Sequence, residues 1–255
     1  MTRRVTAVLS GGGVKAAAHL GAVVAAMLAQ GLAPGEILER VRVVRRHDVA
    51  RLRAAGLVQG LFATALLHAE PLQRTIARLV SATTFAELTV PLTVTAADLD
   101  TSEVVVFGPG GEDAPLHEAL FAACALPPWY PPVVMNGRRL ADGGIRGVLP
   151  LAVAARFECD LVMAVDAGPG TDAAPASGRL APPPFVRAFT DVMHVMMSAN
   201  TELSVALWRA TPQRAPLLYV RPETERGATF AMGQFARYER AGYEAARTAI
   251  NDRTI

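Results

Sequence analysis

Two groups of glycines, one of them next to a carboxylate, hold the residues with which this sequence could do chemistry. The first group, Gly11-Gly12-Gly13, lies between the apolar run Val5–Leu9 and the alanine-rich segment Lys15–Gln30. This pattern predicts a strand, a tight loop and a helix. Glycines expose backbone N–H groups, and a helix start adds a positive dipole. Such a loop binds negative charge, either a phosphate or the oxyanion formed during acyl transfer.

The glycine loop alone does not choose between these ligands. It is not a P-loop, because G-x-x-x-x-G-K-[ST] is absent and Lys15 follows Gly13 by two positions. It is not G-x-G-x-x-G either, because position 16 is Ala. A tight strand-to-helix turn without any ligand is a third interpretation.

The second group contains Asp142, which precedes Gly143 and Gly144 and follows a strand-like segment. The two glycines allow a sharp turn and leave the carboxylate unshielded. A carboxylate within about 2.6–3.2 Å of a serine hydroxyl can take its proton without an intervening His. An Asp that merely shapes an Asp-Gly turn is the alternative interpretation.

Together with Pro91–Asp100 and Ala122–Pro127, these segments make residues 4–168 resemble the bacterial patatin-like phospholipases. The resemblance implies an α/β acyl hydrolase with a Ser–Asp dyad, acting on a lipid or acyl-ester substrate without metal or cofactor. It implies that Gly11, Gly12 and Gly13 form the oxyanion loop and that Asp142 is the dyad base. It also implies that the loop Pro127–Pro132 packs beside the active site.

The family's third signature, the G-x-S-x-G turn that carries the nucleophile, is missing. None of the six serines lies in that pattern: Ser10, Ser81, Ser102, Ser177, Ser198 and Ser204. Ser10 precedes the glycines and would point away from them, and Ser198 and Ser204 fall inside a long helix, where bonding to the preceding turn is the ordinary use. We therefore expect little or no hydrolase activity from this chain.

The missing turn coincides with an irregularity in the order of elements. Lys15–Gln30 and Pro34–Ala55 both have helical patterns, with only a short turn between them. A doubly wound sheet should place a strand between two such helices. The simplest interpretation is a gap near Gly21–Val24 that removes a strand and the serine turn.

The remaining patterns predict one α/β domain over residues 1–255, in three layers, with a mostly parallel sheet covered by helices and lacking one central strand. We expect Val5–Leu9 to pair with fewer neighbours than its burial suggests. A mobile surface loop is expected at about residues 168–184. Further helices are expected at 70–80, 115–125, 150–157, 185–209 and 235–251, and strands at 91–97, 103–107, 161–166 and 217–220.

Composition sets the remaining limits. Apolar residues make up 51% and the formal net charge is +2, so a globular chain without general attraction to nucleic acid is expected. Cys124 and Cys159 do not make a disulfide framework, and we interpret Cys124 as a small buried residue. The five histidines show no metal spacing. No apolar run is long enough to span a membrane, so we expect a cytoplasmic protein with at most transient membrane-surface contact.

Three alternatives stay open at this point. The first is a pseudoenzyme that keeps an acyl-binding cleft and works as a binding or regulatory partner. The second is a chain that carries a deletion relative to a gene whose intact form is an ordinary phospholipase. The third is a phosphate-binding module that uses the glycine loop.

Overall fold

The computed structural model describes residues 3–11, 21–53, 64–168, 184–223 and 235–252. The chain divides into two units. The first, which we call the parallel-sheet unit, contains Met1–Ala18 and Gly147–Ile255, and the second, the antiparallel-sheet unit, contains His19–Arg146.

Three parallel strands form the sheet of the first unit, in the order β1-β6-β7. They are β1 (Val5–Leu9), β6 (Leu161–Val165) and β7 (Leu217–Val220). Val8 lies beside Ala164, and Ala164 lies beside Tyr219. The sequence predicts all three strands as short apolar runs, and the structure confirms each of them.

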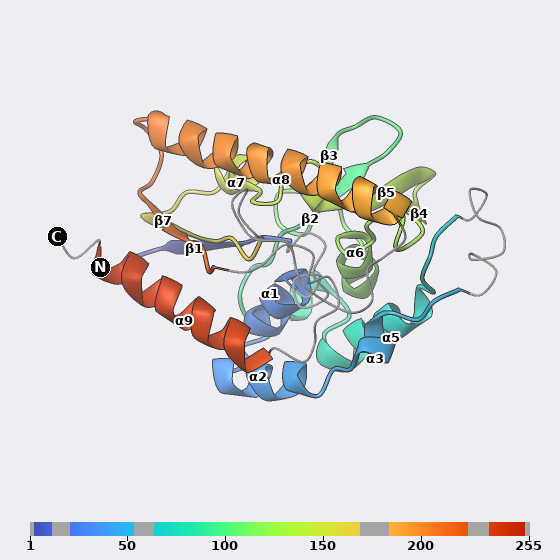
Figure 1. Ribbon diagram of the computed structural model, residues 1–255. Coiled ribbons are helices and arrows are strands. Elements are labelled where there is room, and N and C mark those ends of the chain that lie inside the picture. Colours follow the sequence, from blue (N-terminus) through green and yellow to red (C-terminus); the bar gives the residue numbers. More distant parts are fainter. Residues whose placement is uncertain (1–2, 12–20, 54–63, 169–183, 224–234, 253–255) are drawn as a thin grey trace. The chain divides into compact units, whose positions relative to one another are not determined.

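Helices flank this sheet. Figure 1 shows α8 (Pro184–Ala210) on one side of the strands and α9 (Phe235–Asn251) on the other. The short helix α7 (Leu151–Ala154) joins α8 in a common core with the sheet. That core contains Val8, Leu149, Leu151, Ala154, Val162, Ala164, Val205 and Trp208. The chain is thus an α/β protein with a parallel sheet flanked by helices, as the sequence predicts.

Strand β1 lies at an edge of the described sheet. Within the described residues it pairs with β6 and with no other strand, and Val5 is 53% exposed. An edge position is what a chain lacking a neighbouring strand would have. The loss of that strand itself stays a prediction, and the predicted mobile loop at 168–184 falls largely outside the described residues.

The second unit is built on a four-stranded antiparallel sheet with the order β3-β2-β5-β4. Its strands are β2 (Val94–Asp98), β3 (Val104–Phe107), β4 (Val133–Met135) and β5 (Arg138–Asp142). The β2–β3 hairpin confirms the prediction for residues 91–107. Asp98 Oδ1 accepts the backbone N–H groups of Asp100 and Thr101 and so shapes the connecting turn.

Strand β5 is the strand-like segment expected before Asp142, but β4 and the turn that joins the two strands are absent from the predicted elements. The two-residue loop of this hairpin is Asn136-Gly137, and both residues have positive φ, at 52° and 75°. This is the geometry of the tight hairpin turn for which Asn-Gly is the strongest short sequence signal. The signal is therefore present, but the three-residue strand β4 is too short to stand out beside the preceding prolines.

The described residues of this unit form the helices α1 (Gly21–Ala29), α2 (Pro34–Arg42), α3 (Arg46–Val49), α5 (Glu70–Leu79) and α6 (Leu116–Ala122), with the short 3-10 helices η2 (Phe85–Glu87) and η3 (Gly143–Ile145). The single helix predicted for Pro34–Ala55 is wrong. The chain breaks between α2 and α3 because Arg45 is extended, and its N–H donates to Asp48 Oδ2 over 2.8 Å to start the next helix.

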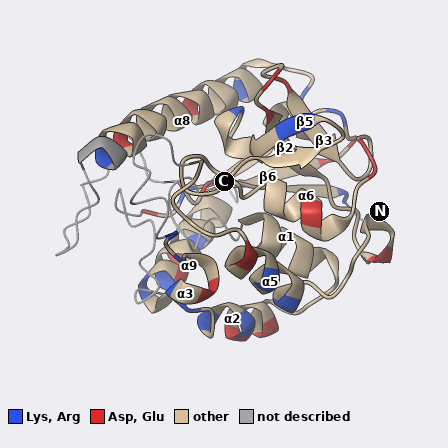
Figure 2. Ribbon diagram, turned by 90° about the vertical axis from the view of Figure 1, so that its right-hand side faces the viewer, with Lys and Arg blue, Asp and Glu red and all other residues tan. Residues whose placement is uncertain are grey.

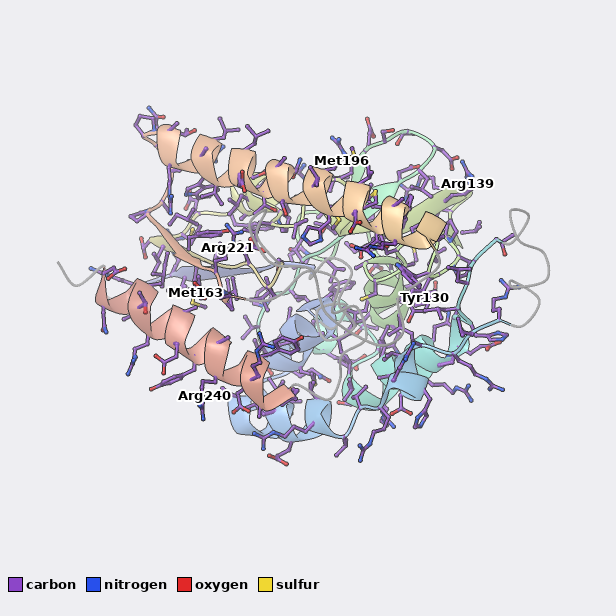
Figure 3. All side chains as sticks on the ribbon, viewed as in Figure 1. Tyr130, Arg139, Met163, Met196, Arg221 and Arg240 are labelled. Atoms are coloured by element: carbon purple, nitrogen blue, oxygen red, sulfur yellow. The ribbon has the colours of Figure 1, made fainter. Side chains whose placement is uncertain are left out.

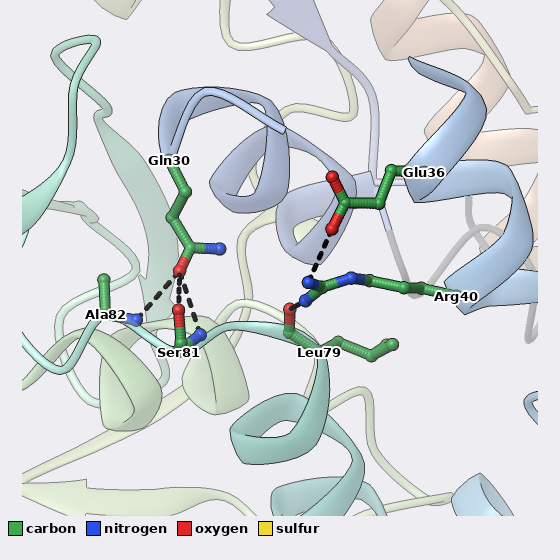
Figure 4. Close-up of polar contacts among 6 residues, drawn as sticks. All are labelled: Gln30, Glu36, Arg40, Leu79, Ser81 and Ala82. Carbon is green, nitrogen blue, oxygen red and sulfur yellow. Dashed lines mark hydrogen bonds and ion pairs between the residues drawn. The ribbon is translucent and has the colours of Figure 1, made fainter. Parts of the chain in front are cut away.

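Side chains at the end of α1 hold the segment after α5. The Oε1 atom of Gln30 accepts from Ser81 N, Ser81 Oγ and Ala82 N, at 2.8–2.9 Å (Figure 4). Arg40 on α2 donates to Leu79 O and to Glu36 Oε1. The outer surface of α2 carries charges of both signs (Figure 2), which is the ordinary character of a solvent-facing helix.

Candidate active site

Asp142 is the last residue of β5 and is buried, with 3% of its surface exposed. Its backbone N–H donates to Ala125 O over 3.1 Å, which ties the strand end to the segment after α6. Its Oδ1 atom accepts the N–H of Gly144 over 2.7 Å and caps η3. The Asp-Gly-Gly sequence therefore makes a strand-to-helix turn that holds a carboxylate at a fixed place.

The electrostatic setting of Asp142 differs from that of a surface carboxylate. Burial raises its pKa from the ordinary value of 3.8 to about 6, although the N–H of Gly144 favours the ionised form. A carboxylate with a pKa near neutrality is a better proton acceptor than an ordinary Asp and is still ionised at pH 7. Asp142 therefore has the ionisation expected of a general base.

Gly143 is required at its position by the close approach of β2. A Cβ atom on this residue would lie 2.4 Å from Thr95 O and 2.7 Å from Thr95 Oγ1. Backbone atoms cannot move aside as a flexible side chain can. The first glycine after Asp142 thus lets the turn pack against the strand Val94–Asp98.

We expect Gly143→Ala to lower the free energy of unfolding by about 2 kcal/mol, because it forces β5 and β2 apart. Gly35→Ala in α2 is the matched control, since a Cβ at Gly35 meets no atom within 4 Å. It should be neutral or slightly stabilising. Urea unfolding of both variants measures the difference, and equal stabilities would contradict the packing argument.

The loop Pro127–Pro132 is neither helix nor strand, as predicted, and it is held on both sides. Pro128 O and Trp129 O accept the N–H groups of Leu66 and Leu67 at 2.9 and 2.8 Å. Tyr130 is buried; its hydroxyl donates to Val49 O, and its ring meets Phe121 edge-on with centroids 6.3 Å apart. The loop is therefore a fixed part of the unit that carries Asp142.

Cys124 is buried with 1% of its surface exposed, and it forms no disulfide. Burial and the nearby charge of Asp142 raise the pKa of its thiol far above the ordinary value. A thiol in this setting is not a nucleophile. The interpretation of Cys124 as a small buried residue is confirmed.

The predicted oxyanion loop is described only in part. The N–H of Gly11 donates to Val148 O over 3.3 Å, so this amide is used in holding β1 to the segment before α7. Gly12 and Gly13 lie outside the described residues, as does Lys15. Any oxyanion role of the loop therefore rests on the amides of Gly12 and Gly13.

Several of the described serines make hydrogen bonds or lie in a turn, and these structural roles account for them. Ser10 is buried, and its Oγ accepts the N–H of Ala167 over 2.8 Å. Ser81 bonds to Gln30, and Ser204 donates to Asn200 O within its own helix. Ser102 adopts a positive φ of 62° in the β2–β3 turn. Ser177 lies outside the described residues.

Ser198 lines a small cavity of about 20 Å³ in the parallel-sheet unit, where β6 and β7 end. The sequence pattern does not single out this cavity, although the carboxyl ends of parallel strands are the usual binding edge of such sheets. It is lined by Val148, Asp166, Gly168, His194, Met197, Ser198, Thr201, Glu202, Tyr219 and Arg221. Asp166 accepts from Gly168 N and from the Tyr219 hydroxyl, at 2.9 and 2.8 Å. The volume suits about one water molecule and is too small for an acyl chain.

Comparisons with known proteins identify the family of the chain. Residues 20–155, more than half of the chain, match the patatin-like phospholipase family, and this stretch contains Asp142 and the loop Pro127–Pro132. The chain belongs to the patatin-like phospholipase family.

Individual proteins are similar to parts of the chain. An uncharacterized NTE family protein of Mycobacterium tuberculosis is 31% identical over 194 residues, which cover 68% of this chain and 52% of that protein. The lysophospholipase NTE1 of Kluyveromyces lactis is 28% identical over 134 residues, covering 48% of this chain and 9% of that protein. The chain thus spans about half the length of its mycobacterial relatives. Among solved structures, VipD from Legionella pneumophila aligns with a TM-score of 0.36 and 15% identity, over 80% of this chain and 38% of that protein.

Across the described segments, no helix combines the length and the apolar character needed to cross a membrane. The same residues contain no group of three or more His, Cys, Asp or Glu side chains placed to hold a metal ion.

Proposed function

We propose that this chain has the acyl-ester hydrolase architecture of its family but hydrolyses lipid esters weakly or not at all, because it lacks the nucleophilic serine. In this proposal Asp142 holds the place of the dyad base, and the loop Gly11–Gly13, through the amides of Gly12 and Gly13, holds that of the oxyanion loop. The single observation that carries the proposal is Asp142 itself: a buried carboxylate with a pKa of about 6, fixed by the turn that follows it. The substrate class is a lipid or acyl ester, reached in the cytoplasm through transient contact with a membrane surface.

The energetic cost of burying Asp142 supports a site built for catalysis. A charged carboxylate buried to this degree is destabilised relative to water, and an uncharged residue would avoid that penalty. The glycine that follows it is fixed by its contact with Thr95. The turn that holds the base is therefore formed within its own unit, even though the sequence has no G-x-S-x-G.

A binding role is the second candidate, and the absence of the nucleophile turn favours it. A protein of this kind would bind an acyl chain or a lipid without cleaving it and would work as a binding or regulatory partner. The binding role predicts that the protein still binds lipid while no covalent acyl-enzyme intermediate forms, whereas a weak hydrolase would form that intermediate.

We expect purified protein to hydrolyse short-chain p-nitrophenyl esters no faster than its Asp142→Ala variant. It should also fail to react with a fluorophosphonate probe that labels an active family member in the same experiment. A clear rate that depends on Asp142 would contradict the absence of a nucleophile, and mass spectrometry of the labelled peptide would then name the residue.

The same preparation separates the two candidates. A non-hydrolysable ether phospholipid should bind the protein if an acyl site persists, and isothermal titration measures that affinity. Binding without turnover supports the binding role. Inorganic phosphate bound with comparable affinity, and no lipid bound, would instead support a phosphate-binding glycine loop.

A further inference from the structure

The helix α8 is apolar on two opposite faces. Its inner face contributes Val205 and Trp208 to the core of the parallel-sheet unit. On the other face five large apolar side chains are more than half exposed: Val192 (58%), Val195 (55%), Met196 (63%), Leu203 (71%) and Leu207 (71%). Figure 3 labels Met196 on this helix. We call these five residues, with Ala199 and Ala206 between them, the outer stripe.

The spacing of the outer stripe matches one side of a helix. Val192, Met196, Ala199, Leu203 and Ala206 follow one another at intervals of four and three residues, which is the seam of a helix that packs against another helix. From Val192 to Leu207 the stripe extends about 22 Å along the axis, at 1.5 Å per residue. An exposed apolar surface of this extent marks a site of association.

We propose that the outer stripe is the interface with a second copy of this chain, packed antiparallel to it. A two-fold axis beside Ala199 and Asn200 places Val192 opposite Leu207 and Met196 opposite Leu203. Both pairs repeat on the other side of the axis, so the stripe is complementary to itself. Ala199 lies at the crossing point, where a small side chain lets the two helices approach closely.

Charges on the flank of the stripe fix the direction of pairing. Asp191 and Arg209 are 18 residues apart, which is five helical turns, so they lie on the same flank. The same two-fold axis sets Asp191 within one residue of the position opposite Arg209 of the partner subunit, and the pair forms twice. A parallel arrangement would set each of these charges beside its own kind, which costs stability.

Both charged groups are available to such a partner. Asp191 is 67% exposed at its side chain and lies 3.9 Å from Arg187 Nε in its own helix. The guanidinium of Arg209 lies over the ring of Tyr219, 5.9 Å from its centroid, and the residue is exposed. Because both side chains are exposed and their contacts within the chain are long, each can also form an ion pair with a partner subunit.

A membrane is a poorer match for the stripe than a second copy. Helices that lie in a bilayer surface carry Lys or Arg along their polar flank, which draws them to anionic lipid. Between Val192 and Leu207 the chain has no Lys or Arg, and the charged residue there is Glu202. Figure 2 shows α8 mostly tan, with few charged positions along its length.

The test is the mass of the full chain in solution, measured by light scattering over a range of concentrations. We expect a dimer, and we expect Met196→Glu and Leu203→Glu each to raise the dimer dissociation constant at least about tenfold. Val134→Glu in β4 is the matched control, because Val134 is 74% exposed and lies in the other unit. It should leave the dimer unchanged. Circular dichroism of each variant shows that the fold persists.

Charge reversal tests the antiparallel pairing separately. Asp191→Arg and Arg209→Asp should each weaken the dimer, and the double variant should restore it, because the two charges meet across the interface. A chain that stays monomeric at every concentration would overturn the proposal. So would recruitment of monomers to vesicles of phosphatidylcholine and phosphatidylglycerol that Leu203→Glu abolishes. Failure of the double variant to restore the dimer would overturn the antiparallel arrangement.

Discussion

Asp142→Asn should become more stable relative to the unmodified chain as the pH rises from about 4 to about 7, by about 3 kcal/mol in total. The reason is the pKa of Asp142, which burial raises from 3.8 to about 6. Asn keeps an oxygen that can accept the N–H of Gly144 but carries no charge. The variant therefore lacks the cost of ionising a buried carboxyl group.

The direction follows from where the proton is bound. Between pH 3.8 and about 6 the folded chain holds a proton on Asp142 that the unfolded chain has released. Because the folded state binds more protons in this window, the free energy of unfolding falls as the pH rises. By about pH 7 both states are ionised, and the loss is nearly complete. The effect belongs to the difference between the two proteins, in which all other titrating groups cancel.

Guanidinium unfolding of both proteins across this pH range measures the effect. A constant offset from the new amide N–H₂ group, which needs its own hydrogen-bond partner, does not change the pH dependence. Asp100→Asn is the control with the opposite sign, because hydrogen bonds from Arg139 hold the pKa of Asp100 below its usual value. There the unmodified chain should gain stability over its variant as the pH rises. A pH-independent difference for Asp142→Asn would show that this carboxyl group titrates as an ordinary Asp.

The elements that the sequence predicts well are those whose pattern is local. The strands β6 and β7 are short apolar runs between polar turns, and α5 and α9 alternate apolar and charged positions with a helical period. No comparable pattern marks the break between α2 and α3, where α2 ends at Arg42 and one extended residue, Arg45, caps the start of α3. Such a break depends on a single capping contact, which periodicity does not reveal.

The sequence singles out the residues of the candidate site but not their properties. Asp142 stands out in the sequence because two glycines follow it, and the structure shows why the first of them is needed. The pKa of Asp142 depends on burial by segments distant in sequence, such as the one that contains Ala125 and Cys124. Likewise, the sequence of α8 is apolar around most of the helix and does not tell which face the core covers. Only tertiary structure separates its inner face from its outer stripe.

Inserting a strand and a G-x-S-x-G turn that follow the family's pattern should restore esterase activity. The structure bears on where the insertion belongs. The predicted junction, Gly21–Val24, is the first turn of α1 as the structure describes it, and Val23 is wholly buried there. An insertion at that point would interrupt a packed helix. Residues 30–33 form the turn between α1 and α2, and a fold in which strands and helices alternate requires a strand between those two helices. Gly31, with a φ of +86°, already makes this segment a tight turn. Turns of this kind tolerate insertion best.

We therefore expect the insertion at residues 30–33 to fold and the matched insertion at Gly21–Val24 to be less stable. A restored central strand buries apolar surface worth about 25 cal/mol per Å², so the first insertion should also raise the melting temperature. Its rate with p-nitrophenyl esters should exceed that of the original chain by at least about a hundredfold, the lower end of what a positioned base supplies. The rate should vanish when the inserted serine or Asp142 becomes Ala.

Two outcomes would contradict this placement or its premise. A stable but inactive insertion at residues 30–33 would mean that the remaining site no longer supports catalysis, and it would favour the binding role. Greater stability and activity from the insertion at Gly21–Val24 would instead place the gap inside α1, where the sequence pattern indicates it. The buried side chain of Val23 argues against that second outcome, because an insertion there must displace a residue that the core fully encloses.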